Sequence, residues 1–356
     1  MLPWGMQPRL LFIPFAAQAE LTGAIALASA RYRAALPAQA LNAMGISAAL
    51  ADYSRVQQPG LAEAELIVIM QPKEQMLAPS QGRDYWPRLF DFIARHRQAG
   101  KRVALDVSDL KIGPDYRAHL AARAGEAAAT AAESLYRRLC ASVDLLAAPT
   151  PALADLLRAA LGDEAPDIVA IPDPVEVARR PPRFAPGAVP KLLWFGTFGS
   201  HANALRKLLQ DDLAALDRPL DLLLLSEPLS AEILHGLQTP RINLRAENWS
   251  LPMLETALAG CDAALLPFNA DDALAAGKSN NRALQALQAG RYFLAHDIAS
   301  YRELAAYGHV GAHLGPALLA ALNDPAAIPP RIAAGQAMID AHYTPAAVAR
   351  LWANLF

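Results

Sequence analysis

The sequence contains little cysteine, which excludes two kinds of structured site. Its two cysteines, Cys140 and Cys261, lie far apart in the 356-residue chain. Two such thiols provide neither a disulfide framework nor a cysteine-based zinc site, and we expect no metal site. Sparse cysteine is also typical of proteins in a reducing compartment, so we expect a cytoplasmic location.

Charge is scarce as well, and neither sign dominates. Charged residues make up 19% of the chain, with 32 Lys and Arg against 34 Asp and Glu, for a net charge of −2. A protein that binds nucleic acid without regard to the nucleotide sequence normally has more Lys and Arg than Asp and Glu, so we expect no nucleic-acid partner. Apolar residues make up 54%, which excludes a disordered chain.

Long apolar runs are missing from the sequence. No stretch approaches the roughly 18 uncharged apolar residues that span a bilayer, so we expect no transmembrane segment. The run Leu10 to Ala17 resembles the core of a signal peptide only loosely, because it contains Pro14 and follows a single basic residue, Arg9. We interpret its first part, Leu10 to Pro14, as a buried strand.

Short apolar runs alternate with helical patterns along the whole chain. Repeated strand–helix units with continuously apolar strands predict an α/β protein whose parallel sheets are covered on both faces. The helix with the clearest start and stop signals follows Thr150, with Pro151 in its first turn and Gly162 after its end. The expected strands are 10–14, 65–70, 102–107, 143–147, 168–171, 191–196, 220–226, 241–244, 262–267 and 291–295.

A change in composition and periodicity divides this alternation into two halves. Six prolines occur from Pro172 to Pro190 without helical or strand periodicity, which is typical of a semi-rigid linker. We therefore predict two Rossmann-like parallel-sheet domains, 1–172 and 191–340, which face a cleft across the linker 173–190. A terminal helix in 341–356 is expected to cross back onto the first domain. Ligands of such sheets bind beyond the carboxyl ends of the strands.

Two segments of the second half suit an anion. The turn that contains Gly196, Thr197 and His201 joins a strand to a helix, where backbone N–H groups can approach a phosphate. A tight turn without a ligand is an equally good interpretation. In the second segment, Lys278 and Arg282 lie four residues apart where a helix is expected to begin, with Ser279 as its cap. Two cations at a helix N-terminus suit a diphosphate, although a solvated pair of bases fits as well.

The motifs around these residues resemble a known family. The segments that carry the resemblance are Trp249, Leu251–Leu254, Ala259–Phe268, Lys278–Gly290 and Ser300–Leu304, with Ser29–Arg33 and Ala148–Thr150 in the first half. The chain is similar to GT-B glycosyltransferases of the group-1 type over most of its length, most specifically in residues 245–305. The resemblance implies transfer of a sugar from a nucleotide-sugar donor, held by the second domain, to a glycan, lipid-linked or protein acceptor held by the first. It also implies chemistry without a metal or other cofactor.

The resemblance also implies roles for single residues. Gly196 and Thr197 match the donor-phosphate loop, and Lys278 and Arg282 the diphosphate-facing helix start, with Ser279 and Asn281 as polar neighbours. Many retaining members carry two Glu separated by seven residues, and here Gly277 and Gln285 stand at those positions. This departure leaves the stereochemistry and the donor open. The amide of Gln285 remains a candidate to bind a ribose hydroxyl.

An inverting enzyme needs a general base on the acceptor side. Asp106 and Asp109, at the end of a first-domain strand, are the candidates, although we favour the alternative that a buried Asp there orients the backbone or pairs with an arginine. His201 is a further candidate, with a polar loop residue as the alternative. Arg31 and Arg33 face either the diphosphate, an acidic acceptor or solvent.

Two other classes of protein fit parts of this pattern. A two-lobed sugar-binding protein also closes two Rossmann-like lobes about a hinge, but it has no need of Lys278 and Arg282 at a helix start. An inactive GT-B relative that serves as an interaction platform accounts for the missing Glu pair. Peripheral contact with a lipid-linked acceptor is compatible with the sequence.

Overall fold

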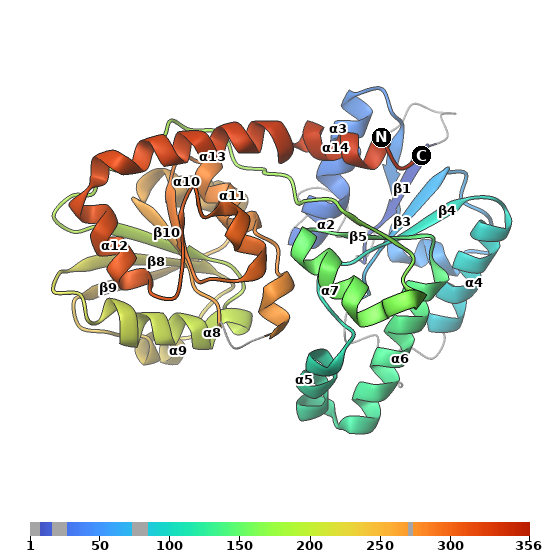
Figure 1. Cartoon of the computed structure of the whole chain (residues 1–356), viewed down its shortest axis with the longest axis horizontal. Coiled ribbons are helices and arrows are strands. Elements are labelled where there is room, and N and C mark those ends of the chain that lie inside the picture. The colour runs from blue at the N-terminus through green and yellow to red at the C-terminus, as the bar shows by residue number, and fades with distance from the viewer. Residues whose placement is uncertain (1–7, 16–26, 73–84, 270–272) are drawn as a thin grey trace. The chain divides into compact units, whose positions relative to one another are not determined.

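The computed structural model describes residues 8–15, 27–72, 85–269 and 273–356. The chain forms two compact units. The first comprises Met1–Pro174, Gly277–Ser279 and Thr344–Phe356, and the second comprises Val175–Ala276 and Asn280–Tyr343. Three segments of the sequence therefore build the first unit, which includes both ends of the chain (Figure 1).

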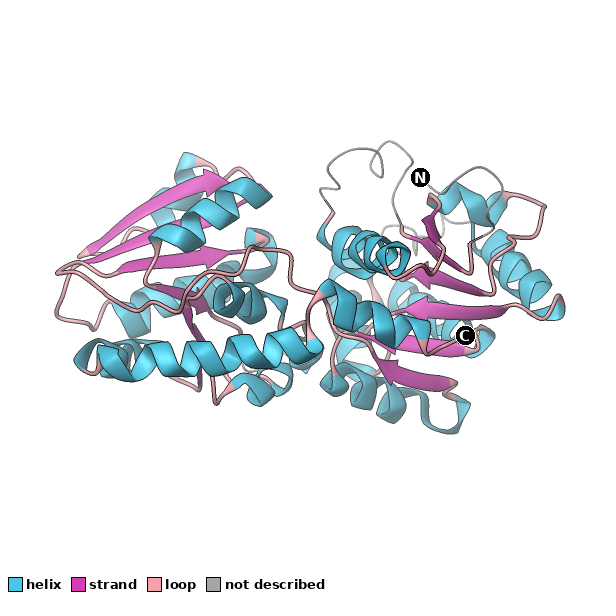
Figure 2. Ribbon diagram, turned by 90° about the horizontal axis from the view of Figure 1, so that it is seen from above, coloured by secondary structure: helices cyan, strands magenta, loops and turns pink. Residues whose placement is uncertain are grey.

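The first unit contains a six-stranded parallel sheet with the order β2-β1-β3-β4-β5-β6. Helices cover both of its faces, as strand–helix alternation requires (Figures 1 and 2). The strands are β1 (Leu10–Ile13), β2 (Ala48–Leu50), β3 (Leu66–Met70), β4 (Arg102–Asp106), β5 (Leu145–Ala148) and β6 (Asp167–Ala170). The main helical segments are α2 (Ala28–Ala30), the π-helical η1 (Arg31–Ala35), α3 (Leu36–Ala43), α4 (Tyr85–Gln98), α5 (Pro114–Ala124), α6 (Glu126–Ser142), α7 (Pro151–Leu161) and α14 (Pro345–Ala353).

The period of two in a strand divides the core of this unit into two layers. Leu11 and Ile13 of β1 belong to the buried cluster on one face of the sheet. Leu10 and Phe12 belong to the cluster on the other face, where Trp352 of α14 also lies. The ring of Trp352 meets that of Phe12 edge-on, with 5.3 Å between the centroids. The last helix is thus part of the hydrophobic core of the first unit.

The second unit contains a six-stranded parallel sheet with the order β9-β8-β7-β10-β11-β12, which is the doubly wound order of dinucleotide-binding domains. Its strands are β7 (Lys191–Phe195), β8 (Leu220–Ser226), β9 (Ile242–Asn248), β10 (Ala263–Leu266), β11 (Tyr292–Ala295) and β12 (His309–Val310). The main helical segments are α8 (Phe198–Lys207), η5 (Leu208–Leu213), α9 (Ala231–Gly236), α10 (Leu251–Gly260), η6 (Ala273–Gly277), α11 (Asn281–Gln288), η7 (Ala299–Leu304), α12 (Leu314–Asn323) and α13 (Ile328–His342).

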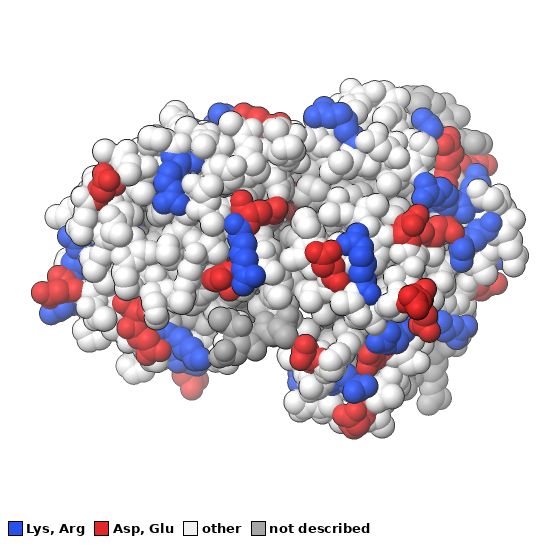
Figure 3. Space-filling view, viewed as in Figure 1, with Lys and Arg blue, Asp and Glu red and all other residues white. Residues whose placement is uncertain are grey.

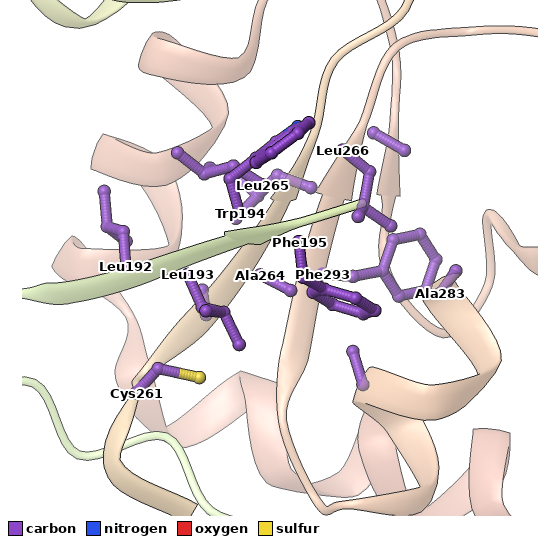
Figure 4. Close-up of a cluster of buried hydrophobic side chains, with 14 of the residues drawn as sticks. Leu192, Leu193, Trp194, Phe195, Cys261, Ala264, Leu265, Leu266, Ala283 and Phe293 are labelled. Carbon is purple, nitrogen blue, oxygen red and sulfur yellow. The ribbon is translucent and has the colours of Figure 1, made fainter. Parts of the chain in front are cut away.

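The core of the second unit is continuous through its central strands. Consecutive residues of β7 point to opposite faces, so Trp194 and Phe195 pack into different layers (Figure 4). The neighbouring strand β10 and the helix α11 contribute further residues to this cluster. From β7 the strands are added in one direction as far as β9, and from β10 they are added on the other side of β7. The point between β7 and β10, where the strand order reverses, is the switch point at which ligands of doubly wound sheets bind.

All ten predicted strands are present, with ends shifted by a few residues. The sequence did not predict the three-residue β2 and the two-residue β12, which lie at sheet edges and are too short to show periodicity. Gly125 separates α5 from α6, and its positive φ of 87° explains why glycine is suited to this position.

The proline-rich segment 173–190 is more than a linker. From Val175 onward it belongs to the second unit, where Val175, Val177 and Phe184 are buried in the core. The boundary between the units falls after Pro174, and the chain returns to the first unit at Thr344. Over the described ranges, none of the helices combines the length and the apolar character that a membrane span requires.

Candidate functional site

A buried ion pair stands where the sequence placed a candidate base. Arg33 of η1 donates from Nε to both carboxylate oxygens of Asp106, over 3.0 and 3.1 Å, and the two residues are 3% and 0% exposed. Arg33 also binds the carbonyl of Ile171 and, over 3.2 Å, the carboxylate of Asp173. Burial lowers the pKa of Arg33, but these carboxylates more than reverse that effect and hold it above its usual value.

This pair corrects two expectations from the sequence. Asp106 has no exposed surface to offer an acceptor, and the structure shows its alternative role, a pair with an arginine. Arg33 is not a solvated base, and its guanidinium is enclosed by carboxylates of its own chain. Arg31, by contrast, is partly exposed, and its guanidinium lies 4.9 Å from the centroid of the Tyr32 ring.

Asp109 occupies a different environment from Asp106. It follows β4, and its side chain is 41% exposed. Gln71 fixes its backbone, because the Gln71 amide donates to the Asp109 carbonyl over 2.8 Å and accepts from the Asp109 N–H over 3.1 Å. Lys278 donates to the Asp109 carboxylate and is equally exposed. Burial raises the pKa of Asp109, but Lys278, assisted by Lys111, holds it below its ordinary value.

The cap predicted for the helix after Lys278 is wrong. Helix α11 begins at Asn281, its N-cap is Asn280, and Asn280 makes no side-chain capping bond. The hydroxyl of Ser279 donates instead to Asp173 over 2.6 Å. Lys278 and Ser279 group with the first unit, whereas Arg282 lies in the first turn of α11 in the second unit. Lys278 and Arg282 therefore do not share one helix face.

Arg282 lies at the switch point of the second sheet. Its Nη1 donates to the carbonyl of Phe195, the last residue of β7, over 3.3 Å. Its guanidinium lies 4.9 Å from the centroid of the Phe268 ring, which follows β10. Gly196 has a φ of 146°, and a Cβ at this position would lie 3.2 Å from Nη1 of Arg282. Glycine thus allows the turn to approach the guanidinium, which places a cation between the carboxyl ends of β7 and β10.

The helix start beside this turn already holds an anion. The carboxylate of Glu227, after β8, accepts hydrogen bonds from the N–H groups of Phe198 and Gly199 over 3.0 and 3.3 Å. It also accepts from the hydroxyl of Ser226 over 2.7 Å. Burial raises the pKa of Glu227, but these donors lower it below its ordinary value. The first N–H groups of α8 are thus occupied by a protein carboxylate, and Thr197 makes no side-chain capping bond.

His201 lies on α8 within an aromatic cluster. Its ring centroid is 6.3 Å from that of Trp194 and 5.5 Å from that of Phe268, both in edge-to-face geometry. The half-buried Trp249 packs against the core of the same unit. Both residues thus contribute apolar packing around the carboxyl ends of the strands.

Gln285 is fully buried and holds the segment that enters the second unit. Its Oε1 accepts the N–H groups of Glu176 and Val177 over 3.2 and 3.1 Å. Its Nε2 donates to Oδ1 of Asn281, which is itself 7% exposed, over 3.3 Å. The amide therefore has a structural role within the unit and presents no exposed surface to a ribose.

We expect the Gln285→Ala variant to be less stable but to bind nucleotide as the parent does. It leaves two buried N–H groups without their acceptor, and each such group costs about 1–3 kcal/mol. Urea denaturation measures this loss, and calorimetry with UDP measures the affinity. A drop in UDP affinity with unchanged stability would instead indicate that Gln285 binds a ribose hydroxyl of the nucleotide.

Several residues of this site were not assigned from the sequence. Asp173 lies shortly after β6, at the start of the expected linker, and Glu227 directly follows β8. For each of them, the only signal in the sequence was a position near the end of a strand. Phe268 and Glu303 lie within the segments that carry the family resemblance, but the sequence assigned no role to either. Glu303 accepts from the Asn280 amide over 2.6 Å and from the Tyr343 hydroxyl over 3.1 Å. Burial raises the pKa of Glu303 despite these bonds.

The comparisons with known proteins concern the fold. No protein-family model matches the sequence, and no curated protein matches it either. Among solved structures, sucrose-phosphate synthase from Thermosynechococcus elongatus is similar over 98% of both chains, with 14% identity and a TM-score of 0.68.

Two further structures are similar along nearly their whole length. HepE from Anabaena, solved in complex with UDP-glucose, shares 13% identity and a TM-score of 0.60, over 97% of this chain and 98% of its own. T4 phage BGT, solved with UDP and Mn²⁺, shares 9% identity and a TM-score of 0.54 over 98% of both chains. The two doubly wound units described above, together with these matches, show that the chain has the GT-B fold.

Proposed function

We propose that the protein is a glycosyltransferase that moves a sugar from a nucleotide-sugar donor to an acceptor hydroxyl. The observation that carries this proposal is the position of Arg282 at the β7/β10 switch point, against the turn of Gly196 and the ring of Phe268. A guanidinium there suits the diphosphate of a donor, because charge-assisted bonds to phosphate oxygens are strong and directional. HepE and T4 phage BGT, which share the fold, were solved with UDP-glucose and UDP.

In the proposed reaction, the second unit binds the donor and the first unit supplies the base. The oxygen of the acceptor hydroxyl attacks the anomeric carbon, and the bond from that carbon to the diphosphate oxygen breaks. The electron pair leaves with the nucleoside diphosphate, and the proton of the hydroxyl passes to a carboxylate. Asp109 is exposed enough for this role, and Asp106 is not. Direct attack of this kind inverts the anomeric configuration.

We further propose that cationic side chains, rather than a metal ion, neutralise the leaving diphosphate. Arg282 and Lys278 supply two positive charges, and the first turn of α11, an eight-residue helix, adds its dipole. The acceptor, whether glycan, lipid-linked or protein, is not specified by these residues.

The test is a thermal-shift panel of uridine, guanosine, adenosine and thymidine diphosphates and their sugars, with EDTA present. A ligand at one hundred times its dissociation constant stabilises a protein by about 2.7 kcal/mol. We expect one diphosphate and its sugars to raise the melting temperature in EDTA. A panel without any shift would contradict the proposed function, and a shift that needs added Mn²⁺ would contradict the metal-free chemistry.

A second candidate function is an inactive GT-B relative that acts as an interaction platform. It is favoured by the missing Glu pair, because Gly277 replaces one carboxylate and the buried Gln285 replaces the other. Gly277 is closely packed within the first unit, where an added Cβ would lie 2.9 Å from Cδ1 of Leu153. Turnover of the donor that the panel selects, to sugar-bearing product or by hydrolysis, would exclude this alternative.

A further inference from the structure

The pair of Lys278 and Asp109 joins two groups that the proposed function needs separately. Lys278 is to bind the donor diphosphate, and Asp109 is to accept the acceptor's proton. In the structure the Lys278 ammonium donates to Oδ1 of Asp109, so each charge neutralises the other. While this pair is formed, Asp109 is a weak base and Lys278 is engaged.

Two sets of contacts hold the backbone on both sides of this pair. Gln71 binds both the N–H and the carbonyl of Asp109. Ser279 donates to Asp173, and Gly277 packs against Leu153 so closely that a Cβ there would clash. The side chain of Lys278, 41% exposed and built on a flexible four-carbon stem, is the part that is free to move.

The chain itself keeps Lys278 within reach of the proposed diphosphate site. Lys278 lies four residues before Arg282, and four residues span at most about 14 Å even when fully extended. The lysine stem covers part of that distance. A diphosphate also carries more negative charge than a carboxylate, so it competes effectively for the ammonium.

We propose that the donor diphosphate takes Lys278 away from Asp109 and thereby frees Asp109 to act as the general base. The inference rests on the proposed function and adds an order to it, in which the donor binds before the acceptor reacts. Lys111 also faces Asp109 electrostatically and remains after Lys278 has left. The release therefore raises the basicity of Asp109 without removing all of the positive charge around it.

The test is a double-mutant cycle on the affinity for UDP, measured by calorimetry with uridine as the control ligand. If the thermal-shift panel selects another base, the diphosphate and the nucleoside of that base take the places of UDP and uridine. Lys278→Met is expected to weaken UDP binding about tenfold or more, since one opposite charge at this range shifts an equilibrium by at least that factor. Asp109→Asn removes the competitor for Lys278, so it is expected to tighten UDP binding about tenfold. Uridine has no phosphate, and its affinity should stay unchanged in both variants.

The decisive comparison is Asp109→Asn in the Lys278→Met background. If the two groups compete, the gain from Asp109→Asn largely disappears there, because no lysine remains to be released. An equal gain in both backgrounds, or no gain in either, would overturn the proposal. If the parent protein binds no diphosphate of the panel, the proposed function itself fails, which is a different result from normal binding without coupling.

Discussion

Replacing Arg33 with methionine is expected to destabilise the first unit by about 3–5 kcal/mol at pH 7, because it leaves a buried carboxylate uncompensated. Asp106 is 0% exposed, and Asp173 lies within 3.2 Å of the same guanidinium. Urea denaturation of the parent and the variant measures the difference. The matched control is Arg158→Met, since Arg158 is 52% exposed in its pair with Asp155 and should matter by less than about 1 kcal/mol.

The loss of Arg33 also predicts a pH dependence with a definite sign. Burial raises the pKa of Asp106, and Arg33 opposes this effect. Burial prevails even with Arg33 present, and without Arg33 the pKa of Asp106 in the folded state rises further above its unfolded-state value. The neutral carboxyl then costs little at low pH, and the penalty grows as pH rises through the raised pKa. The variant should therefore lose more stability at pH 7 than at pH 4, and a pH-independent loss would contradict the buried pair.

Replacing Trp352 with alanine is expected to cost the first unit about 3–5 kcal/mol, as truncation of a fully buried aromatic side chain does. Trp352 is 0% exposed and packs edge-on against Phe12 of β1. The neighbouring Leu351, 38% exposed on the same helix, provides the control, and its alanine variant should change stability little. Equal unfolding midpoints for the two variants would show that α14 is not part of this core.

The regular elements were the part of the structure that local sequence could predict. Continuous apolar runs such as Leu66–Met70 and Leu222–Leu225 identify buried parallel strands without any tertiary information. The helix after Thr150 was predicted from its cap, and the Thr150 hydroxyl accepts the N–H of Leu153 over 3.1 Å. Such signals fall within a few residues of each other, so one sequence is enough to detect them.

The site could be predicted only in part, because its contacts join residues that are far apart in sequence. Arg33 and Asp106 are 73 positions apart in the sequence, and Glu176 donates its N–H to Gln285, which lies 109 positions away. Asp106 is the buried last residue of β4 and Asp109 follows three positions later, partly exposed. Nothing in the local sequence distinguishes these two environments. The environment of Arg282, by contrast, depends on Phe195 and Phe268, which directly end or follow predicted strands.

The surface agrees with the balanced composition of the chain. On the face shown in Figure 3, acidic and basic side chains are interspersed rather than gathered by sign. Exposed side chains of opposite charge also form ion pairs among the described residues, such as Arg302 with Asp297. Affinity for a diphosphate therefore has to come from specific side chains rather than from the overall charge.

The measurement that tests the central claim most directly is the affinity of the Arg282→Ala variant for the diphosphate that the panel selects. Calorimetry should show binding about 10- to 100-fold weaker than in the parent, as expected for the loss of a charge-assisted bond of about 1.5–3 kcal/mol. The control variant Arg302→Ala, which removes an arginine that is 67% exposed and paired with Asp297, should bind as the parent does. If Arg282→Ala retained the parent's affinity for the diphosphate, the switch point would not be the donor site, and the proposed sugar transfer would lose its main support.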